Sequence, residues 1–221
     1  MTPRPGEHST EVLTIGHSTR SLEDFFGLLE AHGVEHLADV RTIPRSRHNP
    51  QFNREGLAGQ LRRIEIEYTH MPTLGGLRHA RRDSPNGGWR NASFRGFADY
   101  MQTPEFEAGL EALIEAAARA RTVIMCAEAV PWRCHRSLIA DALSARGLRV
   151  AHILSATRAE RHALTAFATL EGTRVTYPPE PLPLERVALP PPAEPGCRPR
   201  RAERRRIPDD SAQGACYLGV G

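Results

Sequence analysis

The sequence predicts a single α/β domain with a mostly parallel sheet flanked by helices, followed by a disordered C-terminal tail. Short apolar runs typical of strands alternate with amphipathic stretches typical of helices through residues 11–178. This alternation predicts parallel strands joined by helical crossovers. The composition then changes, because residues 179–221 contain half of the 18 prolines and the arginine-rich run RPRRAERRR. A chain of 221 residues is long enough to bury a core of ordinary size.

The first half of the domain is expected to contain three strands and two helices. In order, these are a strand at 11–18, a helix at 21–33, a strand at 34–41, a helix at 54–66 and a strand at 67–72. Ser21 and Asp24 resemble a capping box at the start of the first helix, and Gly33 is a typical residue just after a helix end. Gly56 and Gly59 weaken the pattern of the second helix.

The second half begins with a loop and then returns to regular structure. Residues 74–93, LGGLRHARRDSPNGGWRNAS, are rich in turn-forming residues and fit no helix or strand. Long loops inside compact domains are usually functional or mobile. The elements expected after it are helices at 94–101 and 104–120, a strand at 122–126, a helix at 137–147, a strand at 149–154 and a last edge strand at 174–178. Thr103 and Pro104 are typical of a helix start.

The two ends of the chain, residues 1–10 and 179–221, are expected to be disordered. The tail in particular cannot bury enough apolar surface to offset the entropy lost on ordering. The N-terminus lacks the apolar stretch of a secretory signal, and no apolar run approaches 18 residues. We therefore expect a cytoplasmic protein without a membrane segment. The sequence does not predict an oligomeric state.

The positive charge of the chain is concentrated in one segment. All 29 basic residues are arginine, and the formal net charge is only +3. Residues 41–95 contain eleven arginines and four acidic residues, a net charge of +7, whereas residues 1–40 have a net charge of −5. A GC-rich genome explains the choice of arginine, but arginine also suits bidentate binding of phosphate. The concentration itself favours an anionic partner, either a small molecule or a nucleic acid.

Polar residues and glycines follow the first four expected strands at the points where the strands end. They are Gly16, His17 and Ser18 after the first strand, Asp39 and Arg41 at the second, Gly75 and Gly76 after the third, and Cys126 and Glu128 at the fourth. In open parallel sheets, ligands bind beyond the carboxyl ends of the strands. We therefore expect these groups to meet at one edge of the sheet.

Each of these groups has a functional and a structural interpretation. His17 is either a general base or a hydrogen-bond donor to phosphate, or it is a histidine that caps the end of its strand. Asp39 and Arg41 point to the same face because side chains alternate along a strand. They either orient a ligand or form a buried structural ion pair. Gly75 and Gly76 allow a ligand to approach the backbone closely, although an ordinary turn has the same sequence.

The segment CAEAVPWRCHRS, residues 126–137, has four competing interpretations. The first is a metal site, for which zinc needs three or four ligands. Cys126, Glu128, Cys134 and His135 could supply them, but the spacing C-x₇-C-H matches no common zinc pattern. We therefore expect no metal here. The second is a phosphatase-like loop, which requires five residues between cysteine and arginine and which this spacing excludes.

The third interpretation is a reactive thiol or a redox pair. Cys134 precedes the expected helix start at Arg136, where the positive end of the helix would lower its pKa. The fourth is an anion pocket lined by arginine, in which the cysteines pack as small apolar residues; we prefer it. The remaining cysteines, Cys197 and Cys216, lie in the tail. Four cysteines so placed do not form a disulfide framework, so we expect reduced thiols.

Five segments in order resemble the family called domain of unknown function 488. They are TIGHSTRSLEDF, DVRTIPRSRHNPQFN, LGGLR, WRNASFRGFADYM and MCAEAVPWRCHRSLIADAL. The resemblance covers roughly residues 12–178 and implies an α/β domain. It also implies functional importance for the GHS, DVR and C-x-E-x-x-P-x-x-CHR motifs, which here are Gly16, His17, Ser18, Asp39, Val40, Arg41, Cys126, Glu128, Pro131, Cys134, His135 and Arg136. It supplies neither a reaction nor a cofactor.

The leading hypothesis is an enzyme, or a former enzyme, that acts on a phosphate-bearing substrate such as a nucleotide or a nucleic acid. The catalytic candidates are His17, Asp39, Glu128, Cys134 and His135, and the substrate-binding candidates are Gly16, Ser18, Arg41, Arg45, Gly75, Gly76, Trp89, Cys126 and Arg136. His17 or Glu128 would act as acid or base, with Cys134 as nucleophile. The loop at 78–95 would act as a lid, with Trp89 available for base stacking.

Two alternatives belong to other functional classes. One is a nucleic-acid-binding module without catalysis, in which phosphates contact the tail arginines together with Arg62, Arg63, Arg78, Arg81 and Arg82. Such binding would weaken steeply with added salt. The other is a thiol-dependent or metal-dependent protein. The sequence does not identify the substrate, the reaction or any cofactor.

Overall fold

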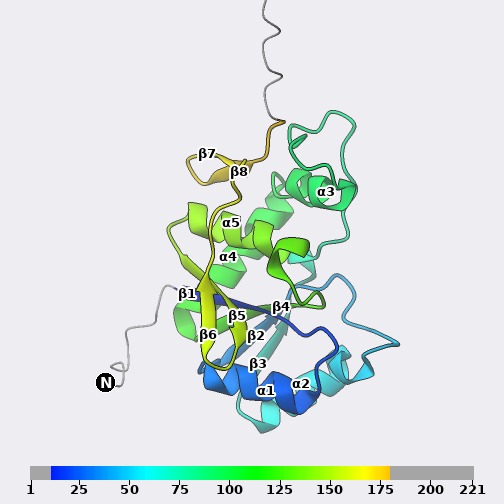
Figure 1. The fold of residues 1–221 in the computed structure, drawn as a ribbon, viewed down its shortest axis with the longest axis vertical. Coiled ribbons are helices and arrows are strands. Elements are labelled where there is room, and N and C mark those ends of the chain that lie inside the picture. The colour runs from blue at the N-terminus through cyan, green and yellow to red at the C-terminus, as the bar shows by residue number, and fades with distance from the viewer. Residues whose placement is uncertain (1–10, 180–221) are drawn as a thin grey trace, which may run out of the picture. The chain divides into compact units, whose positions relative to one another are not determined.

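The computed structural model describes residues 11–179, which contain a six-stranded sheet, five α-helices and a separate two-stranded sheet (Figure 1). The strand order of the main sheet is β3-β2-β4-β1-β5-β6. Its neighbouring strands are parallel except for the antiparallel pair of β5 and β6. The predicted α/β class with a mostly parallel sheet is confirmed. The disorder predicted for residues 1–10 and 179–221 concerns residues that, apart from Pro179, lie outside the described range.

The elements alternate along the chain much as their sequence patterns predict. The strands are β1 Glu11–Gly16, β2 His36–Asp39, β3 Glu67–His70, β4 Thr122–Cys126, β5 Arg149–Ser155, β6 Arg158–Arg161, β7 Thr169–Glu171 and β8 Arg174–Thr176. The α-helices are α1 Leu22–Ala31, α2 Arg54–Arg63, α3 Ala92–Tyr100, α4 Pro104–Arg119 and α5 Arg136–Ala145. Short 3₁₀ helices lie at Pro50–Phe52, Pro72–Leu74 and Pro131–Arg133. In the predicted loop at 74–93, Leu74 ends a 3₁₀ helix, and no α-helix or strand occurs before Ala92.

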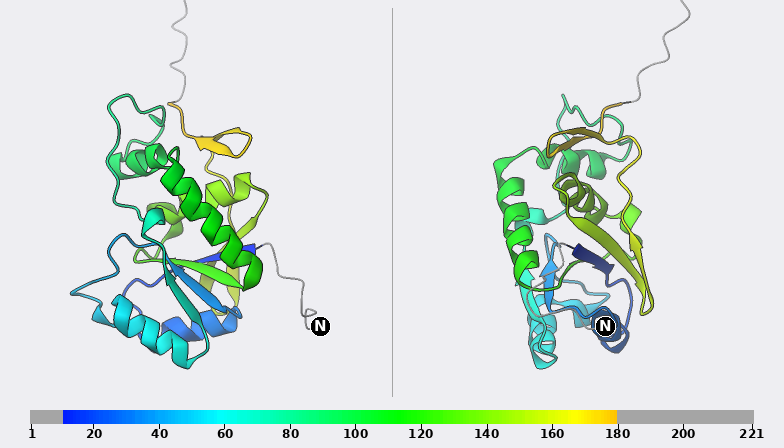
Figure 2. Two further views of the ribbon diagram at one scale, coloured as in Figure 1. Left: turned by 180° about the vertical axis from the view of Figure 1, so that it is seen from behind. Right: turned by 90° about the vertical axis from the view of Figure 1, so that its left-hand side faces the viewer.

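Helices cover both faces of the sheet. In Figure 1, α1 and α2 lie below the sheet and α3, α4 and α5 lie above it, and Figure 2 shows the same layers from two further sides. Successive residues of the strands contribute alternately to the two apolar layers, because side chains alternate along a strand. In β4, for example, Val123 and Met125 pack with α1 and α2, whereas Ile124 packs with the other three helices.

The chain leaves two neighbouring strands in opposite directions. From β1 it passes over one face through α1 to β2, and from β4 it passes over the other face through α5 to β5. Between β1 and β4, the connections therefore diverge at the carboxyl ends of the strands. Such a switch point opens a crevice at this edge of an α/β sheet, and ligands bind there in many proteins.

Local sequence signals explain where the helices begin and end. The Ser21 side chain accepts a hydrogen bond from the Asp24 backbone at 3.0 Å, which caps α1 as predicted. The chain turns after α1 at Gly33, where φ is 61°. Thr103 caps α4, whose first residue is Pro104.

The C-terminal part of the sheet differs from the prediction. The segment at 174–178 was expected to be the edge strand of the main sheet, and this is wrong: β8 pairs with β7 in a separate hairpin. The position beside β5 is already occupied by β6, which follows β5 after a two-residue turn. The β6 sequence RAER is exposed and lacks the apolar pattern of a strand, so periodicity alone could not reveal it. Among residues 11–179, no helix is both long and apolar enough to span a bilayer.

Candidate functional site

The carboxyl ends of β1, β2, β3 and β4 meet at one level of the sheet. Gly16 of β1 pairs with Cys126 of β4, and Asp39 of β2 pairs with Met125 of β4 and with His70 of β3. The convergence expected from the sequence therefore occurs.

Two adjoining cavities open at this edge, with volumes of about 360 Å³ and about 300 Å³, and both are lined by Arg41, Ile43 and Glu128. The larger cavity is also lined by Cys126, Cys134, His135 and Gly76, and the smaller one by His17, Ser18 and Arg45.

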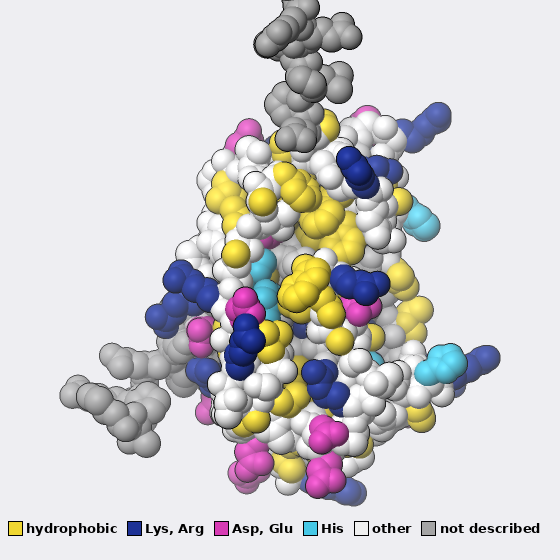
Figure 3. Space-filling view, in the orientation of Figure 1, with side chains coloured by type: hydrophobic (Ala, Val, Ile, Leu, Met, Phe, Trp, Pro, Cys, Tyr) yellow, Lys and Arg dark blue, Asp and Glu magenta, His cyan; other side chains and the backbone are white. Residues whose placement is uncertain are grey.

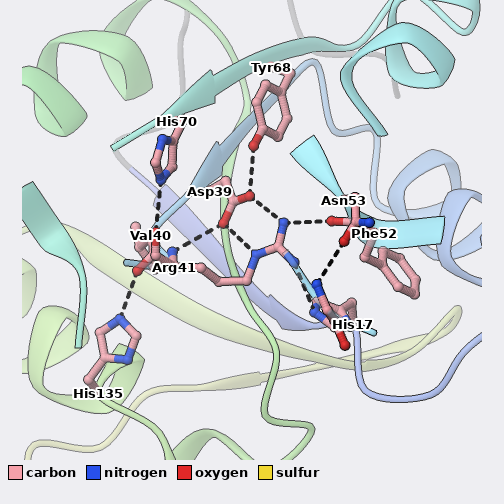
Figure 4. Close-up of polar contacts among 10 residues, drawn as sticks. His17, Asp39, Val40, Arg41, Phe52, Asn53, Tyr68, His70 and His135 are labelled. Carbon is pink, nitrogen blue, oxygen red and sulfur yellow. Dashed lines mark hydrogen bonds and ion pairs between the residues drawn. The ribbon is translucent and has the colours of Figure 1, made fainter. Parts of the chain in front are cut away.

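Arg41 is held from three sides (Figure 4). Its guanidinium donates to both carboxylate oxygens of Asp39, at 2.8 and 2.5 Å, and to the backbone oxygen of Phe52 at 2.8 Å. A third nitrogen donates to His17 at 3.2 Å. Tyr68 donates to the same carboxylate at 2.7 Å, and burial together with the Asp39 charge raises the pKa of Tyr68. Because Asp39 is fully buried and Arg41 is 6% exposed, the two form a buried ion pair with little free capacity for a ligand.

His17 is a neutral positioning group in this network. Arginine can only donate, so the His17 Nε2 accepts from Arg41, and Nδ1 therefore carries the proton and donates to the Ser18 backbone at 2.8 Å. The ring stacks on Phe52 with centroids 4.2 Å apart. Burial, opposed in part by the Ser18 hydrogen bond, lowers the pKa of His17 to about 4. With both nitrogens engaged, His17 holds Arg41 in place in this state.

Arg136 lies behind the cavities and fixes one of their walls. Its guanidinium donates to the backbone oxygen of Glu128 at 2.6 Å and to the Thr14 hydroxyl at 3.4 Å. The side chain is 1% exposed and forms no ion pair with a carboxylate among residues 11–179. A methyl group on Gly16 would lie 1.9 Å from the Glu128 oxygen. Glycine at this position thus lets the 127–129 loop pack directly on β1.

Cys126, Cys134 and His135 form a compact cluster in the wall of the larger cavity. The His135 Nδ1 lies 3.9 Å from the Cys126 sulfur and 3.7 Å from the Cys134 sulfur. These three atoms all lie within 4.8 Å of one another. The other ring nitrogen of His135 donates to the Val40 backbone oxygen at 3.0 Å (Figure 4). The cluster joins the end of β4, the loop after β2 and the start of α5.

The two thiols differ in acidity because they interact. Their mutual interaction is the largest influence: it raises the pKa of Cys126 and lowers the pKa of Cys134. Burial opposes the lowering at Cys134, whereas the Arg136 charge reinforces it. Cys134 is therefore the more readily ionised sulfur, and a thiolate is both a nucleophile and a metal ligand.

The remaining predicted residues lie at different distances from the cavities. Ser18 and Arg45 line the smaller cavity, and Ser18 has a left-handed backbone with φ of 52°. Gly76 faces His135, whereas Gly75 packs against Thr42. Trp89 belongs to an aromatic cluster and lines neither cavity. Its ring packs at tilted or edge-on angles against Phe94, Phe167 and Tyr177.

Sequence reasoning did not assign several lining residues to the site. Ile43 and Leu77 line the larger cavity although they are 63% and 70% exposed, and Phe94 lines it at the start of α3. Arg133 also contributes to the wall. A signal was available for two of them, because Ile43 and Leu77 are isolated apolar residues in polar loops. Phe94 had been read only as part of a helix, and no sequence signal indicates that it faces the cavity.

Comparison with known proteins gives a family but no activity. No curated protein and no solved structure matches the chain. The family model described as Domain of unknown function DUF488 matches residues 21–143, which is more than half of the chain. The matched part contains α1 to α4, most of α5 and the Cys126–Cys134–His135 cluster. The chain therefore belongs to the DUF488 family.

Proposed function

We propose that this protein is an enzyme that acts on a phosphate-bearing substrate, such as a nucleotide, bound in the larger cavity at the carboxyl edge of the sheet. One observation carries the proposal. Potential nucleophiles, Cys126 and Cys134, line the same cavity as His135, the carboxylate of Glu128 and the arginines at its rim. Convergence of reactive and charged groups on one cavity is typical of active sites.

The charge around the cavities favours an anionic substrate. Arg45 and Arg133 are exposed at the cavity walls, and neither forms an ion pair among the residues that the structure describes. Arg136 adds a buried positive charge without a carboxylate partner in that range. Glu128 is the acidic residue of the two linings. We assign anion binding to Arg133 in the larger cavity and to Arg45 in the adjoining smaller one, while Arg41 and Arg136 hold the walls through the contacts described above.

The rim favours a substrate with an apolar or aromatic part next to its anionic group. Ile43 and Leu77 are exposed at the cavity, and Trp132, beside the lining residue Arg133, is 69% exposed. On the face drawn in Figure 3, apolar side chains gather close to arginine side chains. A nucleobase provides a flat surface for such side chains and a phosphate provides the charge. In this proposal Trp132 takes the stacking role that the sequence suggested for Trp89.

The reaction we propose is hydrolysis or transfer of the phosphoryl group. Glu128 is exposed at the boundary of both cavities, where its carboxylate serves as general acid or base. The sulfur and imidazole groups in the cavity wall supply or activate the nucleophile. Such chemistry requires reduced thiols, which agrees with the cytoplasmic location predicted from the sequence.

The test is a screen of the full-length protein with nucleoside phosphates and with nitrophenyl phosphate mono- and diesters. We expect Glu128→Gln to lower kcat by about 10²-fold or more, as removal of a general acid or base does. The double variant Arg45→Ala, Arg133→Ala should mainly raise KM. Arg63→Ala, an exposed arginine on α2, is the matched control. No binding and no turnover of any phosphate ester by the wild type would overturn the proposal.

A nucleic-acid-binding module without catalysis remains the second candidate, because of the +7 charge of residues 41–95. Part of that charge is already engaged. Arg78 lies 3.6 Å over the Tyr100 ring and donates to a backbone oxygen, and Arg81 pairs with Asp83. This candidate predicts that the affinity for nucleic acid falls steeply with added salt. It also predicts that Cys134→Ser and His17→Ala leave this binding unchanged. Loss of function in those two variants would favour the enzyme.

A further inference from the structure

We infer that Cys126, Cys134 and His135 bind a single zinc ion, with its fourth coordination position open to the larger cavity. The inference concerns the same cavity as the proposed function and, for catalysis, rests on it. Metal binding itself requires no substrate. It departs from the expectation of no metal, which was based on sequence spacing alone.

The ligand atoms are already at distances that suit a tetrahedral ion. In a tetrahedral site, zinc bonds of about 2.3 Å to sulfur and about 2.0 Å to nitrogen place sulfur and nitrogen ligands about 3.5 Å apart. The His135 Nδ1 lies 3.7 Å from one sulfur and 3.9 Å from the other. We propose that rotations of the cysteine side chains bring both sulfurs to bonding distance from one ion, because the three ligand atoms already lie within 4.8 Å of one another.

The hydrogen bonds of His135 prepare its free nitrogen for a metal. A backbone oxygen can only accept, so the contact with Val40 at 3.0 Å places the proton on Nε2. In the neutral ring, Nδ1 then carries the lone pair, and it faces the two sulfurs. A backbone carbonyl that binds the far nitrogen is a common outer partner of metal-binding histidines. Phe97 packs against the ring with centroids 5.1 Å apart and fixes its plane.

The backbone around the cluster is also fixed. Cys126 ends the central strand β4, and the 3₁₀ helix Pro131–Arg133 returns the chain so that Cys134 reaches the same place. The Cys134 amide donates to Pro131 at 3.0 Å, and the Ser137 hydroxyl donates to the Cys134 oxygen at 3.0 Å. This return loop accounts for the spacing of seven residues between the cysteines, which conventional zinc motifs do not contain.

Gly76 keeps space free beside the metal-binding nitrogen. A methyl group at this position would lie 2.5 Å from Nδ1 of His135. Glycine therefore allows both the ring and an ion to occupy this part of the cavity. The four residues Gly76, Cys126, Cys134 and His135 all belong to its lining.

With an ion at this position, the cluster would be a zinc site of the catalytic type. Three protein ligands with an open fourth position are typical of catalytic zinc, and two cysteines with one histidine are a known set. Two thiolates and a neutral imidazole would balance the charge of Zn²⁺. Zinc held there would lower the pKa of a water at the open position, so that this water could lose a proton near neutral pH and act as the nucleophile. Glu128 lines the same cavity and would accept that proton.

The experiment uses the full chain with Cys197→Ser and Cys216→Ser, so that the two tail thiols cannot bind metal. The protein is purified in reductant without chelator or metal-affinity tag, and its zinc is measured by mass spectrometry. After removal of metal, Co²⁺ is titrated in, and the d–d and thiolate charge-transfer bands of a tetrahedral site are followed. We expect one ion per chain.

Four variants decide whether the ion binds at the cluster. The affinity for zinc should fall by more than about 100-fold in each of the variants Cys126→Ser, Cys134→Ser and His135→Gln. Even outer hydrogen-bond partners of metal ligands contribute 10–100-fold to metal affinity. Gly76→Ala should also lower the affinity for zinc, although this variant keeps all three ligand residues. His70→Gln is the control, because His70 also donates to a backbone oxygen nearby but belongs outside the cluster. Circular dichroism verifies that each variant is folded.

The outcomes separate this inference from the proposed function. If the reduced protein binds neither Zn²⁺ nor Co²⁺, or if the three ligand variants retain the ion, the metal site is refuted. Tight binding at the cluster without turnover of phosphate esters would support the site and contradict the proposed reaction. Turnover by the metal-free protein would support the proposed reaction and refute a catalytic role for the ion.

Discussion

At the scale of single residues, the two buried arginines of the site have the same charge but different partners. Arg41 is matched by the carboxylate of Asp39, so the pair is nearly neutral and serves to join β2 to His17 and to the Phe52 backbone. Arg136 has backbone oxygens and a hydroxyl as partners instead. Its charge therefore has no carboxylate partner among residues 11–179, and it helps to lower the pKa of the nearby Cys134 thiol.

Removal of Asp39 should be far more damaging than removal of a surface partner. Asp39→Ala leaves the buried Arg41 charge uncompensated and should lower the free energy of unfolding by about 3–5 kcal/mol. Asp83→Ala is the matched control, because it breaks the exposed pair with Arg81 and should change stability little. Urea denaturation of both variants measures the difference. Equal losses in the two variants would show that the Asp39–Arg41 pair is not stabilising.

The sequence predicted which residues meet but not how each one is used. The positions of His17, Asp39 and Arg41 follow from strand ends and from alternation along a strand. Whether Arg41 would bind a ligand or Asp39 depended on the Phe52 carbonyl, 11 residues from Arg41, and on Tyr68, 29 residues from Asp39. Such partners have no local sequence signal.

At the scale of elements, the loop after β4 is shaped by its contact with β1. The loop lies directly over Gly16, and Arg136 at the start of α5 holds its backbone oxygens. The same loop carries Glu128 and leads into the 3₁₀ helix before Cys134. A change at the end of β1 therefore acts on the cavity through this loop, without touching a reactive group.

Gly16→Ala should disturb this packing, and the resulting loss of stability should exceed any change that comes from the backbone propensity of alanine. Its methyl group would lie 1.9 Å from the Glu128 oxygen, so the loop must move. We expect a loss of about 1–3 kcal/mol, as for other overpacked sites. Gly27→Ala in α1 is the control, since nothing lies within 4 Å of the new methyl and the helix should gain about 0.5–1 kcal/mol. Thermal and urea unfolding compare the two, and an unchanged Gly16→Ala protein would refute the tight contact.

At the scale of the whole molecule, the fold brings its site together through topology. The connections from β1 and β4 run over opposite faces, so neither helix covers the crevice between these strands. The same folded body buries several histidines away from water. His17, His36 and His152 are all nearly inaccessible.

These histidines should make the fold sensitive to mild acid. Burial lowers the pKa of all three, to about 4 for His17 and for His152, from the ordinary value of 6.5. Between these values the unfolded chain binds more protons than the folded protein. The contribution of the neutral buried histidines to the free energy of unfolding is therefore fully present above pH 6.5. It is lost as the pH falls toward 4. Urea midpoints at several pH values should decrease through this window, and less steeply in His17→Gln. Constant midpoints would contradict the burial of neutral histidines.

The sequence by itself determined the α/β class, the order of most elements and the strand ends at which polar residues collect. Apolar periodicity and helix caps are local signals, and parallel strands bring their carboxyl ends to one edge. Only the tertiary structure decided that β8 leaves the main sheet, that Arg41 and Arg136 are internally bonded, and that Cys126, Cys134 and His135 converge. These outcomes depend on backbone oxygens and close contacts between distant segments, which residue types and spacing do not encode.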